Sequence, residues 1–359
     1  MSTARLSVEP ILAGKALELA FPAVTDGKIA AINLESARRR AWVRFAQCPR
    51  IAGIAEAVVN AERMTAQFLG DLDALDRMEK LAAQFARVDD TCSAELVNAE
   101  VAAALHRFEE AQVHLGRARL LGAPRQDLKR HSLTIDQACG VRLDVVEAER
   151  RRIAAASGRL EDLVPLGSVL ADLDRFAEAD AVYRDALDSY DGMSPFLPAW
   201  ACFQLGMLWG ELVPVPDLAR GQQWYWRAIE YLSGYVKARV HLAETLTATG
   251  QYADAERILE PTLSSNDPEV RWRLAEVMLA GQRFAEAGKQ LDAARFRFDE
   301  LLRRHELAFA DHGAEFYATR GNDRRRALEL ARVNVANRPT RRAISQASAI
   351  ACRHLGKAS

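Results

Sequence analysis

Two pairs of residues in this chain have the types and the spacing of metal ligands. His241 stands three residues before Glu244, and His312 stands three residues before Glu315. Residues three apart share one face of a helix, so each pair could offer an imidazole nitrogen and a carboxylate oxygen to a divalent metal. However, Glu244 in HLAETL has a counterpart in Glu276 of RLAEVM. This recurrence indicates ordinary surface carboxylates, so we predict no metal site and no cofactor.

The sequence motifs of common enzymes are missing. The chain has no Gly-rich phosphate loop, no serine-nucleophile elbow, no paired cysteine cluster and no HExxH sequence. We therefore predict that it is not an enzyme. A role as the accessory subunit of an enzyme, using His241, Glu244, Glu276 and His312, is a remote alternative.

Composition and charge set limits on the partners. The formal net charge is -1 over 359 residues, so no whole-chain field draws the protein to nucleic acid or to an acidic membrane. Arg5, Glu9, Lys15 and Glu18 interrupt the apolar stretch that a secretory signal needs, and no run of about 18 apolar residues occurs elsewhere. We expect a cytoplasmic protein with no membrane partner.

The elements that would position these side chains are helices arranged as a repeat. In four stretches an aromatic residue precedes an alanine by three: Phe108 and Ala111, Phe176 and Ala179, Tyr252 and Ala255, Phe284 and Ala287. Phe108 and Phe176 are 68 residues apart, which is twice 34. A fixed period of this size is typical of a helical repeat array, in which each unit packs only on its neighbours.

The stretch from Leu163 to Ala186 shows why small and large residues alternate. Gly167 and Ala179 remove side-chain bulk where two antiparallel helices cross, and Tyr183 fills the groove beyond them. We expect this contact to recur along the array.

This pattern of large, small and large residues, followed by an alanine pair in the second helix, resembles the tetratricopeptide-repeat family. The resemblance implies an all-α fold, a right-handed α-α superhelix of about seven to eight helical hairpins. The array covers residues 51–340, with unit starts near 56, 92, 126, 160, 199, 236, 268 and 308. Residues 1–50 form a helical segment whose pairing is open, and residues 341–359 form a C-terminal capping helix.

Three units carry individual features. In the unit from 126, Val145 stands in place of the alanine, so its second helix should pack less closely. The unit from 199 has an enlarged turn at 210–217 that resembles the Sel1-like branch of the family. This turn is either a contact site or a tolerated insertion. In the unit from 268, Asn266 or Asp267 caps a helix that begins at Pro268.

In the resembled family the first helix of each hairpin lines a concave groove, and the groove residues stand at positions 2, 5, 6 and 9 of a unit. Exposed aromatics beside lysine and arginine are typical of a contact patch, which we predict in the C-terminal half. The predicted partner-binding residues are Trp200, Phe203, Gln204, Met207, Lys237, His241, Glu244, Trp272, Arg273, Glu276, His312 and Phe316. The alternative is that Trp200 and Trp272 pack against the adjacent unit.

A basic stretch near the C-terminus is the remaining candidate site. Eight arginines lie between Arg320 and Arg342, against Asp323 and Glu329. Nucleic-acid binding would need stacking aromatics among them, and this stretch has none, so we expect no nucleic acid. A solvated helix face is the favoured interpretation, and an acidic protein segment as partner is the next.

The leading functional hypothesis is a non-catalytic scaffold, adaptor or assembly factor that holds a protein or peptide in the groove. The alternative is a regulator that senses a peptide or metabolite and acts through a partner chain. Because the end units of arrays often pair, a homodimer is also open.

Overall fold

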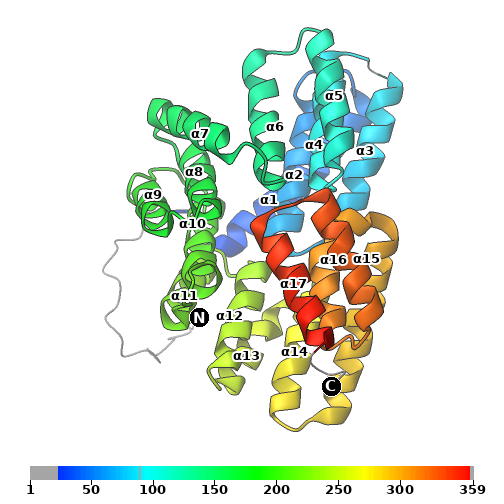
Figure 1. Ribbon diagram of the computed structural model, residues 1–359. Helices are drawn as coiled ribbons and strands as arrows, with labels where there is room; N and C mark the ends of the chain where they lie inside the picture. The colour runs from blue at the N-terminus through cyan, green and yellow to red at the C-terminus, as the bar shows by residue number, and fades with distance from the viewer. Residues whose placement is uncertain (1–22, 89, 356–359) are drawn as a thin grey trace, which may run out of the picture.

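The chain is helical throughout the part that the structure describes. The computed structural model describes residues 23–88 and 90–355, and within these ranges it contains seventeen α-helices and no strand (Figure 1). The predicted all-α class is confirmed. The helices are α1 (Gly27–Gln47), α2 (Ile54–Leu69), α3 (Ala74–Val88), α4 (Cys92–Ala104), α5 (Phe108–Leu120), α6 (Arg125–Ala138), α7 (Leu143–Ser157), α8 (Leu160–Asp172), α9 (Phe176–Asp188), α10 (Phe196–Met207), α11 (Leu218–Tyr231), α12 (Val236–Ala248), α13 (Tyr252–Leu259), α14 (Pro268–Ala280), α15 (Phe284–Ala318), α16 (Arg324–Asn337) and α17 (Arg341–Leu355).

Successive helices pair as hairpins. The pairs include α4 with α5, α8 with α9, α10 with α11, α12 with α13, and α14 with α15. The helices α4, α6, α8, α10, α12 and α14 begin within three residues of the expected unit starts at 92, 126, 160, 199, 236 and 268. The backbone of α15 breaks at His305 (φ -139°, ψ 54°), and this break divides α15 into the second helix of one hairpin and the first helix of the next. None of the described helices is both long enough and apolar enough to cross a bilayer.

The 34-residue period is written in the backbone of the hairpin turns. His106, Gly140 and Asp174 all have positive φ (55°, 68° and 60°) and stand 34 residues apart. The residue after each of them donates its N–H to the carbonyl five residues earlier, as Arg107 does to Ala102 at 2.8 Å. This bond closes a helix C-terminus. Hairpins with this turn and this period make the fold tetratricopeptide-like.

The hairpin from Arg125 departs from the others by one residue. Its turn has a second left-handed residue, Arg142 (φ 51°), directly before α7. The additional residue rotates α7, so that Val146 is fully buried and Val145 is 48% exposed. The position equivalent to the alanine is therefore Val146, and the assignment to Val145 was wrong by one. Only Val146 and Ala154 of α7 are buried, which is the loose packing expected of this helix.

Glycines make room for tyrosines where the helices cross. A Cβ atom on Gly167 would lie 2.4 Å from a ring carbon of Tyr183, and one on Gly206 would lie 2.4 Å from the ring of Tyr225. Such a distance is far inside van der Waals contact. The close helix contact predicted at Gly167 is confirmed.

The two halves of the chain also share their cores. Phe68 of α2 contacts Phe196 and Tyr235, with ring centroids 5.1 Å and 4.9 Å apart. A second core joins residues of α1–α4 with residues of α14–α17. The expectation that each unit packs only on its neighbours is therefore wrong, because the first helices return to the last ones. The open pairing of the N-terminal segment is settled for its described part, since α1 packs against α2.

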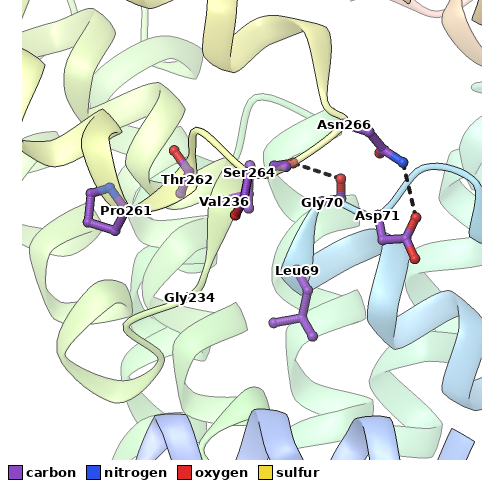
Figure 2. A pocket seen from close by; sticks show the side chains of 10 residues that line it. Leu69, Gly70, Asp71, Gly234, Val236, Pro261, Thr262, Ser264 and Asn266 are labelled. Atoms are coloured by element: carbon purple, nitrogen blue, oxygen red, sulfur yellow. Dashed lines mark hydrogen bonds between the residues drawn. The ribbon is translucent and has the colours of Figure 1, made fainter.

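A seam of hydrogen bonds marks the place where the two halves meet. Asn266 accepts a bond from the N–H of Leu72 at 2.7 Å and donates to the carboxylates of Asp71 and Asp73 at 3.1 Å and 3.0 Å. The Ser265 hydroxyl donates to the carbonyl of Gly70 at 2.8 Å. Figure 2 shows these contacts beside a cavity of about 330 Å³. The cap of α14 is Asp267, one of the two predicted residues, which leaves Asn266 for the seam.

Candidate functional site

The aromatic side chains expected in the groove are mostly buried. Phe203, Trp272 and Phe316 are 8%, 1% and 0% exposed. The rings of Trp272 and Phe316 lie 5.5 Å apart, and Phe316 stacks on Phe298 at 4.8 Å. The prediction that these three residues form an exposed contact patch was wrong. The alternative of packing between units applies to Trp272, and Trp200 is likewise half-buried against the large core, as is Met207.

The polar residues one position further along the same helices face other polar side chains. A first helix packs both on its own second helix and on the next hairpin, so position 5 lies inside while position 6, about 100° further around, does not. Gln204 of α10 donates to the Ser168 hydroxyl of α8 at 2.9 Å. His241 of α12 and Arg273 of α14 bind carboxylates.

Glu211 is the partner of His241. It lies in a π-helical turn, Leu208–Leu212, at the end of α10. Its Oε1 accepts a bond from His241 Nδ1 at 2.6 Å and from the Tyr225 hydroxyl at 2.8 Å. Burial alone would raise the pKa of Glu211, but the charge and the hydrogen bond of His241 outweigh it and lower this pKa to about 2. Burial opposes protonation of His241, and the Glu211 carboxylate raises its pKa all the same.

Arg273 collects carboxylates from three helices. It binds Glu276 of its own helix at 3.0 Å, Glu244 of α12 at 2.9 Å and Glu315 of α15 at 3.8 Å. Its guanidinium carbon also lies 4.0 Å from the centroid of the Trp272 ring. Burial raises the pKa of Glu244 to about 7 although Arg273 opposes the shift. Arg273 is saturated by its own chain, so it is not available to clamp a partner's carboxylate.

A third group surrounds His312. Its Nδ1 binds the Glu269 carboxylate of α14. The charge of Asp311, with that of Glu269, raises the pKa of His312 to about 10 against the effect of burial. Burial would raise the pKa of Glu269, but His312 lowers it well below its usual range. Asp267 has a pKa raised to about 6, chiefly by burial, and Lys237 of α12 adds a positive charge nearby.

We call these side chains the inner polar cluster. It comprises Glu211, His241, Glu244, Glu269, Arg273, Glu276, His312 and Glu315. Its five carboxylates face one guanidinium and two imidazoles whose pKa values are raised, so two negative charges remain when both imidazoles are protonated. Glu244, His312 and Glu315 have side chains 39%, 44% and 46% exposed. The cluster can therefore receive charged or hydrogen-bonding groups from outside.

Neither of the metal-type pairs acts as a pair. His241 binds Glu211 rather than Glu244, and His312 binds Glu269 rather than Glu315. Within the described ranges, Asp76, Glu79 and His305 do place three ligand-type atoms within 4.8 Å of one another. Arginines already neutralise both carboxylates there, since Arg304 binds Asp76 and Arg107 binds Glu79.

Sequence reasoning left Glu211, Glu269 and Glu315 out of the predicted binding residues. Glu269 stands at position 2 of its unit, so the spacing rule alone could have found it. Glu315 was noted only as a metal-type residue. Glu211 gives no signal in the spacing, because a π-helical turn displaces side chains from the α-helical register.

The comparisons with known proteins return structures only. No protein-family model and no curated protein matches this chain. The C-terminal part of a TPR repeat-containing protein from Cytophaga hutchinsonii is 13% identical, with a TM-score of 0.34, over 81% of this chain and 97% of that one. Yeast Tom70 is 10% identical (TM-score 0.36; 86% and 76% covered), and a human IFIT1 dimer with m7Gppp-AAAA is 13% identical (TM-score 0.37; 92% and 74% covered). The tetratricopeptide-like architecture is established here from this chain's own turns and hairpins.

Proposed function

We propose that this protein is a non-catalytic scaffold that holds a protein or peptide partner against the inner polar cluster. The observation that carries the proposal is the exposure of Glu244, His312 and Glu315 on consecutive hairpins. Charged side chains that are fixed by neighbours but still reach solvent recognise a partner with little loss of side-chain freedom. A cytoplasmic location belongs to the same proposal.

The test is affinity capture with cross-linking from a lysate of the source organism. The wild type is compared with a double charge reversal, Glu244→Lys with Glu315→Lys. We expect the reversal to remove the same captured proteins that the wild type retains, because like charges across an interface are strongly unfavourable. Since a lysine beside Arg273 costs stability, the neutral pair Glu244→Gln with Glu315→Gln is measured as well.

The matched control reverses two exposed glutamates on second helices, Glu109→Lys in α5 and Glu286→Lys in α15. We expect this control to capture the wild-type set. If the inner reversal and the outer reversal behave alike while both remain folded by circular dichroism, the inner polar cluster is not the binding site.

A further inference from the structure

The segment between α16 and α17 crosses four consecutive turns of the array. We call residues Asn337–Arg342 the strap. Its contacts are Asn337 Nδ2 to the carbonyl of His106 at 2.9 Å, Thr340 against Gly140, an ion pair of Arg341 with Asp174, and Arg342 with Glu211 at 3.5 Å. Three of these turn residues are the left-handed ones that repeat every 34 residues. Because the turns are evenly spaced, an extended segment can meet one turn after another.

The arginines of the basic stretch find their partners within the chain. Of the eight from Arg320 to Arg342, six have a carboxylate partner. Five of these partners lie outside the stretch, namely Glu276, Asp299, Asp311, Asp174 and Glu211. The interpretation of this stretch as a solvated helix face was therefore wrong. The strap is a basic peptide lying on acidic acceptors.

The strap is attached weakly. Arg341 and Arg342 have side chains 77% and 67% exposed, and exposed ion pairs contribute little to stability and are screened by salt. Between Arg341 and Cys352, α17 buries only Ala343 and Ile350. Few buried apolar contacts mark a segment that opens before the rest of a fold does. α17 lies across the front of the molecule in Figure 1, where nothing in the described chain covers it.

We propose that the surface beneath the strap is a docking site for a basic, arginine-bearing segment of a partner protein, and that the strap occupies this site until the partner displaces it. The acceptors are the carboxylates of Asp174 and Glu211 and the backbone carbonyl of His106. The charge of these acceptors excludes an acidic partner. This inference rests on the proposed function for the existence of a protein partner and adds its chemistry.

The test uses a fluorescent peptide with the sequence of residues 336–347, ANRPTRRAISQA, and the full chain. The double variant Arg341→Asp with Arg342→Asp removes the attraction of the strap for its site. It leaves α17 able to form, since acidic residues in a first turn favour a helix. We expect the variant to bind the peptide at least about tenfold more tightly than the wild type does, because the strap no longer competes. Adding Asp174→Asn should reverse this gain, and raised salt should weaken it.

Two further measurements make the result decisive. The control Arg324→Asp with Arg325→Asp reverses two exposed arginines at the start of α16, and it should bind the peptide as weakly as the wild type. Hydrogen exchange of α17 should become faster in the strap variant and remain unchanged in the control. Faster exchange without peptide binding would show that the surface is no docking site for a basic segment, and unchanged exchange would show that these pairs do not hold the strap. Either result leaves the capture experiment on Glu244 and Glu315 standing, so the two proposals fail separately.

Discussion

At the scale of single residues, Glu244 occupies a place that does not favour its charge. It shares Arg273 with Glu276 and Glu315, and burial raises its pKa to about 7. A carboxyl group whose pKa is higher in the folded state than in the unfolded state lowers stability as it ionises. Such a residue is retained against its cost to the fold, which is consistent with a role in binding.

The substitution Glu244→Gln should therefore stabilise the protein in a pH-dependent way. Below pH 4.5 the carboxyl group is protonated in both states and the variant should equal the wild type; above pH 7 it is ionised in both, and the full penalty applies. Because the side chain is 39% exposed and water screens it, we expect a gain of only about 1 kcal/mol at pH 8. Thermal unfolding from pH 4.5 to 8.5 measures this, with Glu109→Gln on the outer face as control. A variant less stable than the wild type at pH 8 would contradict the prediction.

Neighbouring residues show where the sequence stops being informative about the site. Helical spacing brought His241, Glu244, Arg273 and Glu276 into one stripe, and the structure does bring these side chains together. The same spacing placed Trp272 beside them, although it is buried. Positions 5 and 6 differ by a rotation of about 100°, and which of them lies inside depends on a neighbouring hairpin that local periodicity does not describe.

At the scale of the helices, the repeat is maintained by the contact of Gly167 with Tyr183. A Cβ at Gly167 would approach the Tyr183 ring carbons Cε1, Cδ1 and Cζ to between 2.4 Å and 2.8 Å. Tyr183 is 2% exposed and its hydroxyl group lies 3.1 Å from that of Ser168, so the ring has little room to move. The helices α8 and α9 must separate if the glycine gains a methyl group.

Gly167→Ala is therefore expected to destabilise the fold by about 1–3 kcal/mol. The control is Gly116→Ala in α5, where an added Cβ would have no atom within 4 Å. That change should stabilise the protein by about 0.5–1 kcal/mol, because alanine favours a helix over glycine. Urea unfolding of the two variants compares them, and a shift in the same direction for both would show that crowding at Tyr183 does not control this contact.

The helix pattern was predictable from the sequence because it depends on local chemistry. The recurring aromatic and alanine pairs gave the hairpins, and Asp267 before Pro268 gave the start of α14. The second left-handed residue at Arg142 and the break in α15 at His305 were not predictable. Neither residue is a glycine, and each conformation depends on the packing of the helices on either side.

At the scale of the whole molecule, the closure of the array links its ends to the inner polar cluster. Asn266 directly precedes the cap of α14, the helix that carries Glu269, Arg273 and Glu276. Arg297 strengthens the same seam, since it binds the carbonyl of Asn266 at 3.0 Å and the carboxylate of Asp73 at 2.8 Å. The turn between α2 and α3 therefore helps to fix the helix at the centre of the cluster. No repeat pattern predicts this closure, because the residues that make it are more than 190 positions apart.

Asn266→Ala should loosen that link without removing any member of the cluster. The change deletes one bond to a backbone N–H and two to carboxylates, so we expect a loss of about 2 kcal/mol in the free energy of unfolding. Hydrogen exchange should become faster in α2, α3 and the first turn of α14 together, and stay unchanged in α6 and α7, which lie away from the seam (Figure 1). Asn60→Ala, on the exposed face of α2, provides the control. If α14 keeps its wild-type exchange while α2 and α3 become faster, the cluster is held by its own hairpins alone, and closure serves the stability of the N-terminal helices rather than the geometry of the site.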